Sequence, residues 1–392
     1  MFYNPGMDDA LARLKILSAQ TAFDLDGNSA AQCPTLDAFT QKEKDGAFVH
    51  AAQLPNGQQI KLLKTLLSSV CERDCYYCPF RTGRDMRRAT FQPEEFARLF
   101  AKLHQAGAVE GLFISSGLAG GGVRTQDKLL DAADIIRNRM NFRGYIHIKL
   151  MPGVEKEQVL RAMQLADRVS INLEAPNTKR LSRLAPHKQF IEELLQPLQW
   201  VDDLRRTRPP QENYKGRWPS TVTQFVAGGA DESDLELLAT TDHLHRRLNL
   251  GRAYFSAFRP IPDTPLENKP PTDPKRQHRL YQASFLLRDY GFDLEDMPFA
   301  SDGNLPLEAD PKAVWANRYL RQAPVEINHA ERSALLRVPG IGPAGATRIL
   351  NARREQKIHS LRDLQKLGVR IKRAAPFILL DGAQPAHQLR LF

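Results

Sequence analysis

Six short apolar segments, separated from one another by helix-like segments, occupy residues 61–258. We expect strands at 61–67, 111–116, 145–150, 168–173, 221–226 and 252–258, with helices between them at 93–107, 126–140, 155–166, 188–206 and 232–248. This alternation favours a parallel sheet or barrel, because each helix returns the chain to the same edge of the sheet. Six strands in about 200 residues fit an α/β fold of the partial (β/α)6 TIM-like type better than a complete eight-stranded barrel.

The sequence on either side of the barrel predicts three further parts. We interpret the chain as an N-terminal helix with an irregular extension (1–59), the barrel (60–265), a linker with a helical strap (266–325) and a C-terminal all-α module (326–392). Helical spacing at 8–22 gives way to turn-rich sequence at 23–59. A proline-rich stretch at 259–274 interrupts the barrel pattern and marks the start of the linker.

The formal net charge of +10 is concentrated in two windows of the sequence. Residues 326–392 carry 12 Lys and Arg against 5 Asp and Glu, and residues 79–92 carry four Arg against one Asp. Such clustering favours a polyanionic partner, although two solvated basic faces would give the same counts. No window approaches the ~18 apolar residues of a membrane span and the first residues lack a secretory signal, so we expect a cytoplasmic protein without membrane contacts.

Three of the four cysteines lie close together, directly after the first expected strand. Cys71, Cys75 and Cys78 form the pattern C-x-x-x-C-x-x-C. Barrel enzymes carry their chemistry in the loops after their strands, and three thiolates there can hold three irons of a 4Fe-4S cluster and leave the fourth iron open. The alternative is a closed zinc or iron–sulfur site that uses Cys33, although the paired knuckles or histidines typical of zinc are absent from the sequence.

The C-terminal module contains a segment, 335–350, that resembles a helix–hairpin–helix motif. Its glycines permit a tight turn, and the turn together with the next helix presents backbone N–H groups to a phosphate. Paired copies of such a motif hold a duplex through its phosphates, whereas an ordinary helical turn or a protein-docking module is the simpler interpretation. The residues that we expect to contact nucleic acid here are Gly340, Ile341, Gly342, Ala344, Gly345, Arg348 and Arg353.

The second basic window directly follows the cysteines. Its arginines are expected to border the mouth of the barrel, where they can hold a substrate phosphate, or else pair with carboxylates or water. These candidate phosphate contacts are Arg81, Arg84, Arg87 and Arg88.

The cysteine spacing after the first strand of a partial barrel resembles the radical S-adenosylmethionine (radical SAM) superfamily. The resemblance implies a 4Fe-4S cluster whose open iron binds S-adenosyl-L-methionine, and reduction by an electron donor such as flavodoxin or ferredoxin. The residues that match the family's cofactor positions are Tyr77 and Gly228 near the adenine, Ser115, Ser116 and Gly117 near the methionine amino group, Asn172 and Glu174 at the ribose, and Arg183 and Lys188 at the methionine carboxylate. The family's Gly-Gly-Glu-like motif is altered here, because serines replace its first glycine and its glutamate is absent.

A closer resemblance extends over nearly the whole chain. Residues 64–67, 110–117, 144–149, 167–174, 184–188 and 255–262 are similar to the DNA modification/repair radical SAM proteins, which often accompany uracil-DNA-glycosylase-like proteins. This resemblance implies a radical enzyme that modifies or repairs DNA, without defining the reaction. The alternatives are a radical SAM enzyme that acts on RNA or another substrate, and a non-enzymatic DNA-binding protein with a structural Fe-S cluster.

Overall fold

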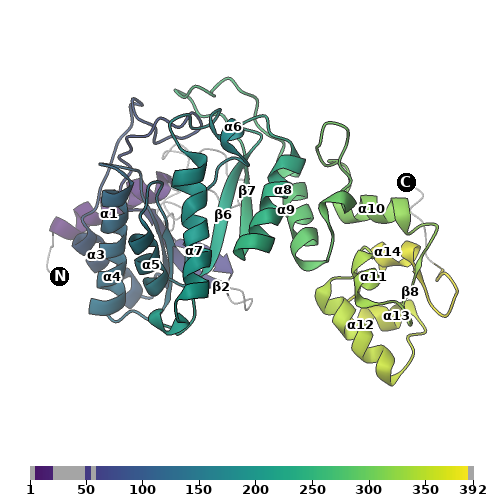
Figure 1. Ribbon diagram of the computed structural model, residues 1–392. Coiled ribbons are helices and arrows are strands. Elements are labelled where there is room, and N and C mark those ends of the chain that lie inside the picture. Colours follow the sequence, from purple (N-terminus) through teal and green to yellow (C-terminus); the bar gives the residue numbers. More distant parts are fainter. Residues whose placement is uncertain (1–4, 21–48, 54–58, 387–392) are drawn as a thin grey trace. The chain divides into compact units, whose positions relative to one another are not determined.

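The computed structural model describes residues 5–20, 49–53 and 59–386 (Figure 1). The chain divides into two compact units. The first comprises residues 1–232 and 244–272, and the second comprises residues 233–243 and 273–392. The second unit therefore begins earlier in the chain than the module expected from residue 326.

A seven-stranded sheet in the order β1 to β7 forms the centre of the first unit. Strands β2 to β7 are all parallel to their neighbours and form the partial barrel that the sequence predicts. Their bounds are Gln59–Leu66 (β2), Gly111–Ser115 (β3), Tyr145–Lys149 (β4), Arg168–Ser170 (β5), Ser220–Ala227 (β6) and Arg252–Ala257 (β7).

One strand contradicts the prediction of an irregular extension at 23–59. Residues Val49–Gln53 form β1, which pairs antiparallel with β2 in the register Val49↔Leu63. Asn56-Gly57, between the two strands in the sequence, is a hairpin signal that would have indicated this pairing. The expectation for residues 21–48 and 54–58 lies outside the described residues.

Helices connect the parallel strands, and successive helices pack against one another: α3 on α4, α4 on α5 and α5 on α7 (Figure 1). Helix α3 shows why these segments are helical, since Pro93 stands in its first turn, acidic residues follow it, and Phe96 and Phe100 on one face are buried. The bounds are Pro5–Gln20 (α1), Pro93–Gln105 (α3), Gly122–Asp134 (α4), Lys156–Leu165 (α5), Thr178–Leu181 (α6), Gln196–Thr207 (α7) and Asp234–Leu248 (α8). Short π-helices at Ile135–Arg139 and Phe190–Leu195 extend α4 and precede α7.

The strand residues alternate between two environments. Leu112, Ile146, Ile148 and Val169 are fully buried in the apolar core. The residues at alternate positions, among them His147, line a hollow on the other side of the strands. The carboxyl ends of β2 to β7 lie at one edge of the sheet, so the loops that follow these strands can share a site.

The second unit is mainly helical. Its helices are α9 (Pro274–Asp289), α10 (Pro311–Tyr319), α11 (Arg332–Arg337), α12 (Pro343–Glu355), α13 (Leu361–Lys366) and α14 (Ile371–Ala374), and a small parallel sheet joins β8 (Val325–Glu326) to β9 (Ile378–Leu379). One apolar core contains Ala316 of α10, Leu335 of α11, Ile349 of α12 and Ile378 of β9. Helix α10 thus folds with the helices that the sequence assigned to the C-terminal module. No helix among the described residues has the length and apolarity needed to cross a membrane.

Candidate functional site

The three clustered cysteines lie in a loop after β2, and their thiols are free. The backbone of this loop is bound to two other loops of the barrel. The N–H of Glu72 donates to the carbonyl of Leu118 after β3 at 2.7 Å, and the N–H of Tyr76 donates to the carbonyl of Leu184 after β5 at 2.7 Å. The cysteine loop is therefore bound to the segments that follow β3 and β5 in the chain.

Two contacts between the cysteine loop and the loop after β3 were not predicted from the sequence. A Cβ atom at Gly117 would overlap the carbonyl oxygen of Val70 and lie 3.2 Å from the Cβ of Cys71, so only glycine fits at this position. The Glu72 carboxylate accepts the N–H groups of Gly120 and Gly121, both at 3.0 Å. Gly117 thus has a steric role beside the first cysteine, in addition to any contact with a cofactor.

Arg88 holds the two ends of the cysteine loop together. Its guanidinium donates to the carbonyls of Ser69 at 2.6 Å, Phe80 at 2.8 Å and Arg81 at 3.0 Å. Arg84 similarly donates to the carbonyls of two prolines, Pro79 and Pro262. The predicted phosphate contacts at Arg84 and Arg88 are therefore occupied by backbone carbonyls, whereas Arg87 is exposed and Arg81 is partly buried.

A buried ion pair lies next to the cysteines. Lys188 Nζ is 3.3 Å from Glu174 Oε1, and the two side chains are only 9% and 7% exposed. Burial and the charge of the same carboxylate raise the pKa of Tyr77 well above its usual value. Burial lowers the pKa of Lys188, but the charges of Cys75 and Glu174 outweigh this effect and hold that pKa above its usual value. The structure therefore brings together Tyr77, Glu174 and Lys188, which the sequence assigned to three different parts of the cofactor.

Glu174 is held in an unusual backbone conformation. Its φ of 64° lies in the left-handed region, where residues other than glycine are strained. Hydrogen bonds of 2.9 Å to the Gln224 carbonyl and 2.8 Å from the Val226 N–H fix this conformation against β6. A buried, strained carboxylate beside free thiols is typical of a functional site.

The cysteine arrangement fits a cluster better than a single ion. Burial raises the pKa of both Cys75 and Cys78, which favours their protonated form when no metal is bound, and a metal bound here would displace their protons. Within the described residues, no group of three or more His, Cys, Asp or Glu could hold one metal ion. A 4Fe-4S cluster makes a different demand, because each thiolate binds a separate iron. Cys33, the fourth ligand of the closed-site alternative, lies outside the described residues.

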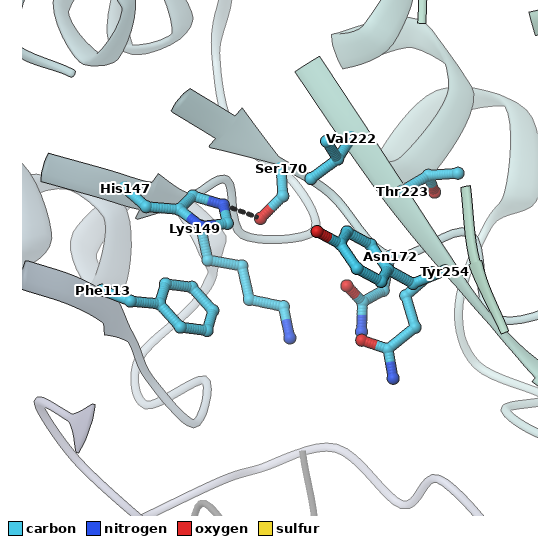
Figure 2. Close-up of a pocket in the computed structure, with 9 residues that line it drawn as sticks. Phe113, His147, Lys149, Ser170, Asn172, Val222, Thr223 and Tyr254 are labelled. Carbon is cyan, nitrogen blue, oxygen red and sulfur yellow. Dashed lines mark hydrogen bonds between the residues drawn. The ribbon is translucent and has the colours of Figure 1, made fainter. Parts of the chain in front are cut away.

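The remaining predicted cofactor residues are more dispersed. Asn172 lines the hollow inside the barrel, with Lys149 and Tyr254 (Figure 2). Arg183 is 47% exposed and forms an ion pair with Asp231 at 3.1 Å. The predicted contacts of Asn172 with the ribose and of Arg183 with the methionine carboxylate stay predictions.

The other cofactor positions lie at the ends of strands. Ser115 is buried as the last residue of β3, and the Ser116 hydroxyl donates to the Gly117 carbonyl at 2.8 Å. Gly228 follows β6 with a φ of 88°, and its N–H donates to the carboxylate of Glu232. Their predicted contacts with S-adenosylmethionine stay predictions.

In the second unit, the segment predicted as a hairpin forms a tight turn between α11 and α12. Gly340 has a φ of 88°, and a Cβ atom there would lie 2.6 Å from the Arg370 carbonyl oxygen. The first helical hydrogen bond of α12 runs from the Ala346 N–H to the Gly342 carbonyl at 2.8 Å. The N–H groups of Ala344 and Gly345 thus precede the first bonded turn, and Ala344 is exposed.

Two of the arginines predicted to contact nucleic acid bind backbone carbonyls instead. Arg348 donates to the Leu367 carbonyl at 2.6 Å, and Arg353 donates to the carbonyls of Ile327 and Ala330 at 3.0 and 2.7 Å. These contacts of the two arginines stabilise the second unit, and they were not predicted from the sequence. Ile341 is 1% exposed, so it contributes to the core and not to a contact surface.

A buried lysine beneath the turn was also missed from the sequence. Lys312 Nζ donates to the Ile341 carbonyl at 2.6 Å and lies 4.6 Å from the centre of the Tyr290 ring. Burial and the nearby charge of Arg373 lower the pKa of Lys312 to about 7. A lysine in a proline-initiated helix gives no sequence signal of burial, because lysine is usually exposed.

Comparison with known proteins agrees with the cysteine loop. Residues 65–207 match the model of the Radical SAM superfamily. This match covers β2 to β5 and the whole of the cysteine loop, so this region of the chain is a radical SAM enzyme domain. The superfamily implies a 4Fe-4S cluster, which Cys71, Cys75 and Cys78 would hold, and S-adenosylmethionine as its second cofactor.

Similar solved structures include methylornithine synthase (PylB), with 13% identity, a TM-score of 0.45, and coverage of 58% of this chain and 62% of that chain. HydG, a maturase of the FeFe-hydrogenase, has 13% identity and a TM-score of 0.45, with coverage of 72% of this chain and 62% of that chain. A radical SAM methyltransferase from Sphaerobacter thermophilus has 15% identity and a TM-score of 0.42, with coverage of 70% and 85%. The chain thus spans about three fifths of the length of the first two, and no curated protein matches it.

Proposed function

We propose that this chain cleaves S-adenosylmethionine reductively at a 4Fe-4S cluster and uses the resulting 5′-deoxyadenosyl radical to modify or repair DNA. The observation that carries the proposal is the cysteine loop, which carries three free thiols and whose backbone is bound to the segments that follow β3 and β5. The bound cofactors supply the radical chemistry, and the protein binds them, orients them and excludes water.

The residues around the loop support this chemistry. Lys188 and Glu174 place a buried cation and a buried carboxylate beside the thiols. A carboxylate can accept hydrogen bonds from ribose hydroxyls, and an ammonium can hold a carboxylate such as that of methionine. Because the two groups already pair with each other, S-adenosylmethionine would have to share or replace this ion pair.

The DNA substrate is supported by the second unit. The turn between α11 and α12 leaves two N–H groups ahead of the first bonded turn of α12, that of the exposed Ala344 and that of the buried Gly345. A helix N-terminus of this kind favours a phosphate, and the excess of basic residues in 326–392 favours a polyanion. Contacts of this type hold a duplex without reading its sequence.

The radical chemistry is tested by anaerobic reconstitution of the cluster, followed by addition of S-adenosylmethionine and a chemical reductant. We expect the wild type to release 5′-deoxyadenosine and the Cys75→Ala variant to release none. Equal release from both proteins, or none from the reconstituted wild type, would contradict the proposal. If the cluster is only structural, its visible absorption spectrum should not change when S-adenosylmethionine is added.

The DNA role is tested separately with Ala344→Asp. The new carboxylate lies near the positive end of the α12 dipole, so it stabilises the helix and the fold should be retained. The same negative charge repels a phosphate, so the affinity for a duplex should fall. Ser333→Asp is the matched control, because it adds the same charge to the first turn of α11, outside the turn. Equal duplex affinity of the two variants, measured by fluorescence anisotropy at several salt concentrations, would contradict the proposal, and a parallel titration with RNA distinguishes the two nucleic acids.

Two partners follow from the proposed reaction. Reductive cleavage consumes one electron per turnover, so the enzyme needs a donor such as flavodoxin or ferredoxin. A uracil-DNA-glycosylase-like protein is the second proposed partner, and co-purification of tagged protein from cells tests both.

A further inference from the structure

Helix α10 of the second unit ends in an exposed aromatic residue. Tyr319 is 50% exposed, more than any other large hydrophobic side chain among the described residues. An isolated aromatic ring on a surface needs no explanation, because more than half of the surface of a folded protein is apolar. Tyr319 is not isolated, since its ring is the outermost of three aromatic rings that are in contact with one another.

These three rings form an aromatic row that runs from the core of the second unit to its surface. The ring centres of Phe292 and Trp315 are 5.5 Å apart, and those of Trp315 and Tyr319 are 4.9 Å apart. Phe292 is fully buried, and Trp315 is partly buried against the apolar core. Contacts between aromatic rings at these distances are favourable. The inner two rings therefore support the ring of Tyr319 from one side, and the rest of that ring stays in contact with solvent.

A buried cation fixes the inner part of the row. The guanidinium carbon of Arg337 lies 4.0 Å from the centre of the Phe292 ring and 4.9 Å from that of Trp315. Asp296 neutralises this guanidinium at 2.7 Å. Because Trp315 is held in this way, the ring of Tyr319 is ordered before a ligand binds, which reduces the entropy lost on binding.

Two arginines beside Tyr319 make the same surface positive. Residues 311–325 contain neither Asp nor Glu, and Arg318 and Arg321 are both exposed. The guanidinium carbon of Arg318 lies 5.6 Å from the centre of the Tyr319 ring, and Arg321 Nε donates to Asn317 Oδ1 at 2.9 Å. Neither arginine forms an ion pair with a carboxylate of the described residues. Both charges are therefore available to an anionic ligand.

This combination of groups fits an unpaired nucleotide. A nucleobase stacks on an exposed aromatic ring, and guanidinium groups beside the ring bind the phosphates on either side of the base. The bases of an intact duplex are already stacked on one another, so only an unpaired or terminal base is free to do this. An acidic protein segment fits less well, because its carboxylates would be attracted to the arginines but repelled by the negative face of the ring.

The other end of α10 contacts the turn between α11 and α12, where Lys312 Nζ donates to the Ile341 carbonyl (Figure 1). Lys312 and Tyr319 are seven residues apart, which is about two turns and roughly 10 Å along the helix axis. Three nucleotides of a B-form strand extend over about the same distance. A strand with a phosphate at the turn is therefore long enough to place a base near Tyr319 about three nucleotides away.

We infer that the surface formed by Trp315, Arg318, Tyr319 and Arg321 binds an unpaired base of a nucleic acid. The base stacks on Tyr319, and the two arginines contact the phosphates that flank it. This inference rests on the proposed function for its choice of a nucleic acid. It adds to that function a preference for DNA with a single-stranded part, such as a gap or an overhang.

The test compares two single-stranded oligonucleotides of equal length, one with bases and one in which abasic sites replace the bases. Binding of each to the full-length protein is measured by fluorescence anisotropy. Tyr319→Ala should weaken binding of the first about tenfold and leave binding of the second unchanged, because stacking needs a base. Tyr319→Phe keeps the ring and should bind both like the wild type.

The arginines are tested by the salt dependence of the same binding. Each phosphate that is neutralised on a single strand contributes ~0.7 to the slope of log affinity against log salt, so Arg318→Ala combined with Arg321→Ala should reduce that slope by about 1.4. Arg98→Ala combined with Arg247→Ala removes two exposed arginines of the first unit and should leave the slope unchanged. An unchanged slope in the first pair of variants would contradict the phosphate contacts.

Three results would overturn the inference: no binding of the base-containing oligonucleotide by the wild type, equal effects of Tyr319→Ala on both oligonucleotides, and equal competition by polyglutamate and by unlabelled oligonucleotide. The third would show a site for acidic protein segments instead. Duplex affinity of Ala344→Asp separates this inference from the proposed function. If that variant binds a blunt duplex like the wild type while Tyr319→Ala still weakens single-strand binding, the duplex proposal fails and the assignment of this surface stands.

Discussion

The buried ion pair of Lys188 and Glu174 allows a quantitative test of the site. The two charged atoms are 3.3 Å apart, and both side chains are less than one tenth exposed. At this distance two unit charges attract by about 5 kcal/mol at an effective dielectric constant of ~20. Removal of either partner leaves the other charge buried without compensation, which typically destabilises a protein by ~3–5 kcal/mol.

A double-mutant cycle isolates this interaction. Lys188→Met removes the cation and keeps most of the side-chain volume, and Glu174→Gln removes the anion and keeps the size of the side chain. Each single variant should lose ~3–5 kcal/mol of unfolding free energy, and the double variant should lose less than the sum by at least ~2 kcal/mol. The assay is urea unfolding of the metal-free, reduced protein at pH 7.

The pH of the assay matters because the pair is strongest when both groups are charged. The pKa of Lys188 is raised in the folded protein, so its contribution to stability is fully present at pH 7 and would be lost only as the pH rises through that raised value. The exposed pair Lys156–Asp203, with a distance of 2.7 Å, is the matched control and should show no measurable coupling. A coupling below ~0.5 kcal/mol for Lys188 and Glu174 would refute the reasoning, since independent sites are additive to this level.

Three further predictions concern other parts of the chain. Arg88→Ala should lower the iron content per chain after reconstitution, because it removes the carbonyl contacts that close the cysteine loop, whereas Arg87→Ala, at an exposed site, should leave iron content unchanged. Gly340→Ala should destabilise the second unit by ~1–3 kcal/mol, measured by hydrogen exchange of α11 and α12, because its Cβ atom would meet the Arg370 carbonyl at a positive φ. Because the pKa of Lys312 is lowered to about 7, the unfolded chain binds more protons than the folded chain above pH 7, so the stability of this unit should rise between pH 7 and 9 by up to ~2.7 kcal/mol. Lys312→Met should abolish that rise.

The alternation of strands and helices was predictable from the sequence because it depends on local pattern. Parallel strands buried on both faces appear as short apolar runs, such as the run at 111–115, and the six predicted strands correspond to β2 to β7. The edge strand β1 was missed because five residues of moderate polarity, VHAAQ, carry little periodicity of their own. Its pairing with β2 supplies the stabilisation that its sequence lacks.

The candidate site was only partly predictable, because its contacts connect residues far apart in the sequence. The cysteine spacing identified the ligands, and the separate matches identified Tyr77, Glu174 and Lys188. Nothing in the sequence indicated that Lys188 neutralises Glu174, since that pairing depends on how the loop after β5 folds back over the barrel. The residues that line the hollow were missed for a different reason. Lys149 and Gln224 are polar residues within apolar runs, and the sequence alone does not say which side chains of a strand face the inside of the barrel.

The cysteine loop shows how far a metal motif depends on residues outside it. Three thiols must be held at positions that allow each to bind a separate iron. Besides the backbone bonds of the loop, the carbonyls that Arg88 binds, the space that Gly117 leaves and the N–H groups that Glu72 accepts help to fix the path of the chain. None of these three residues can be a ligand of iron in the proposed cluster. A chain that kept all three cysteines but lost these contacts would no longer hold the thiols in the positions that a cluster requires. Substitution of Arg88 or Gly117 should therefore destabilise the cluster nearly as strongly as substitution of a cysteine.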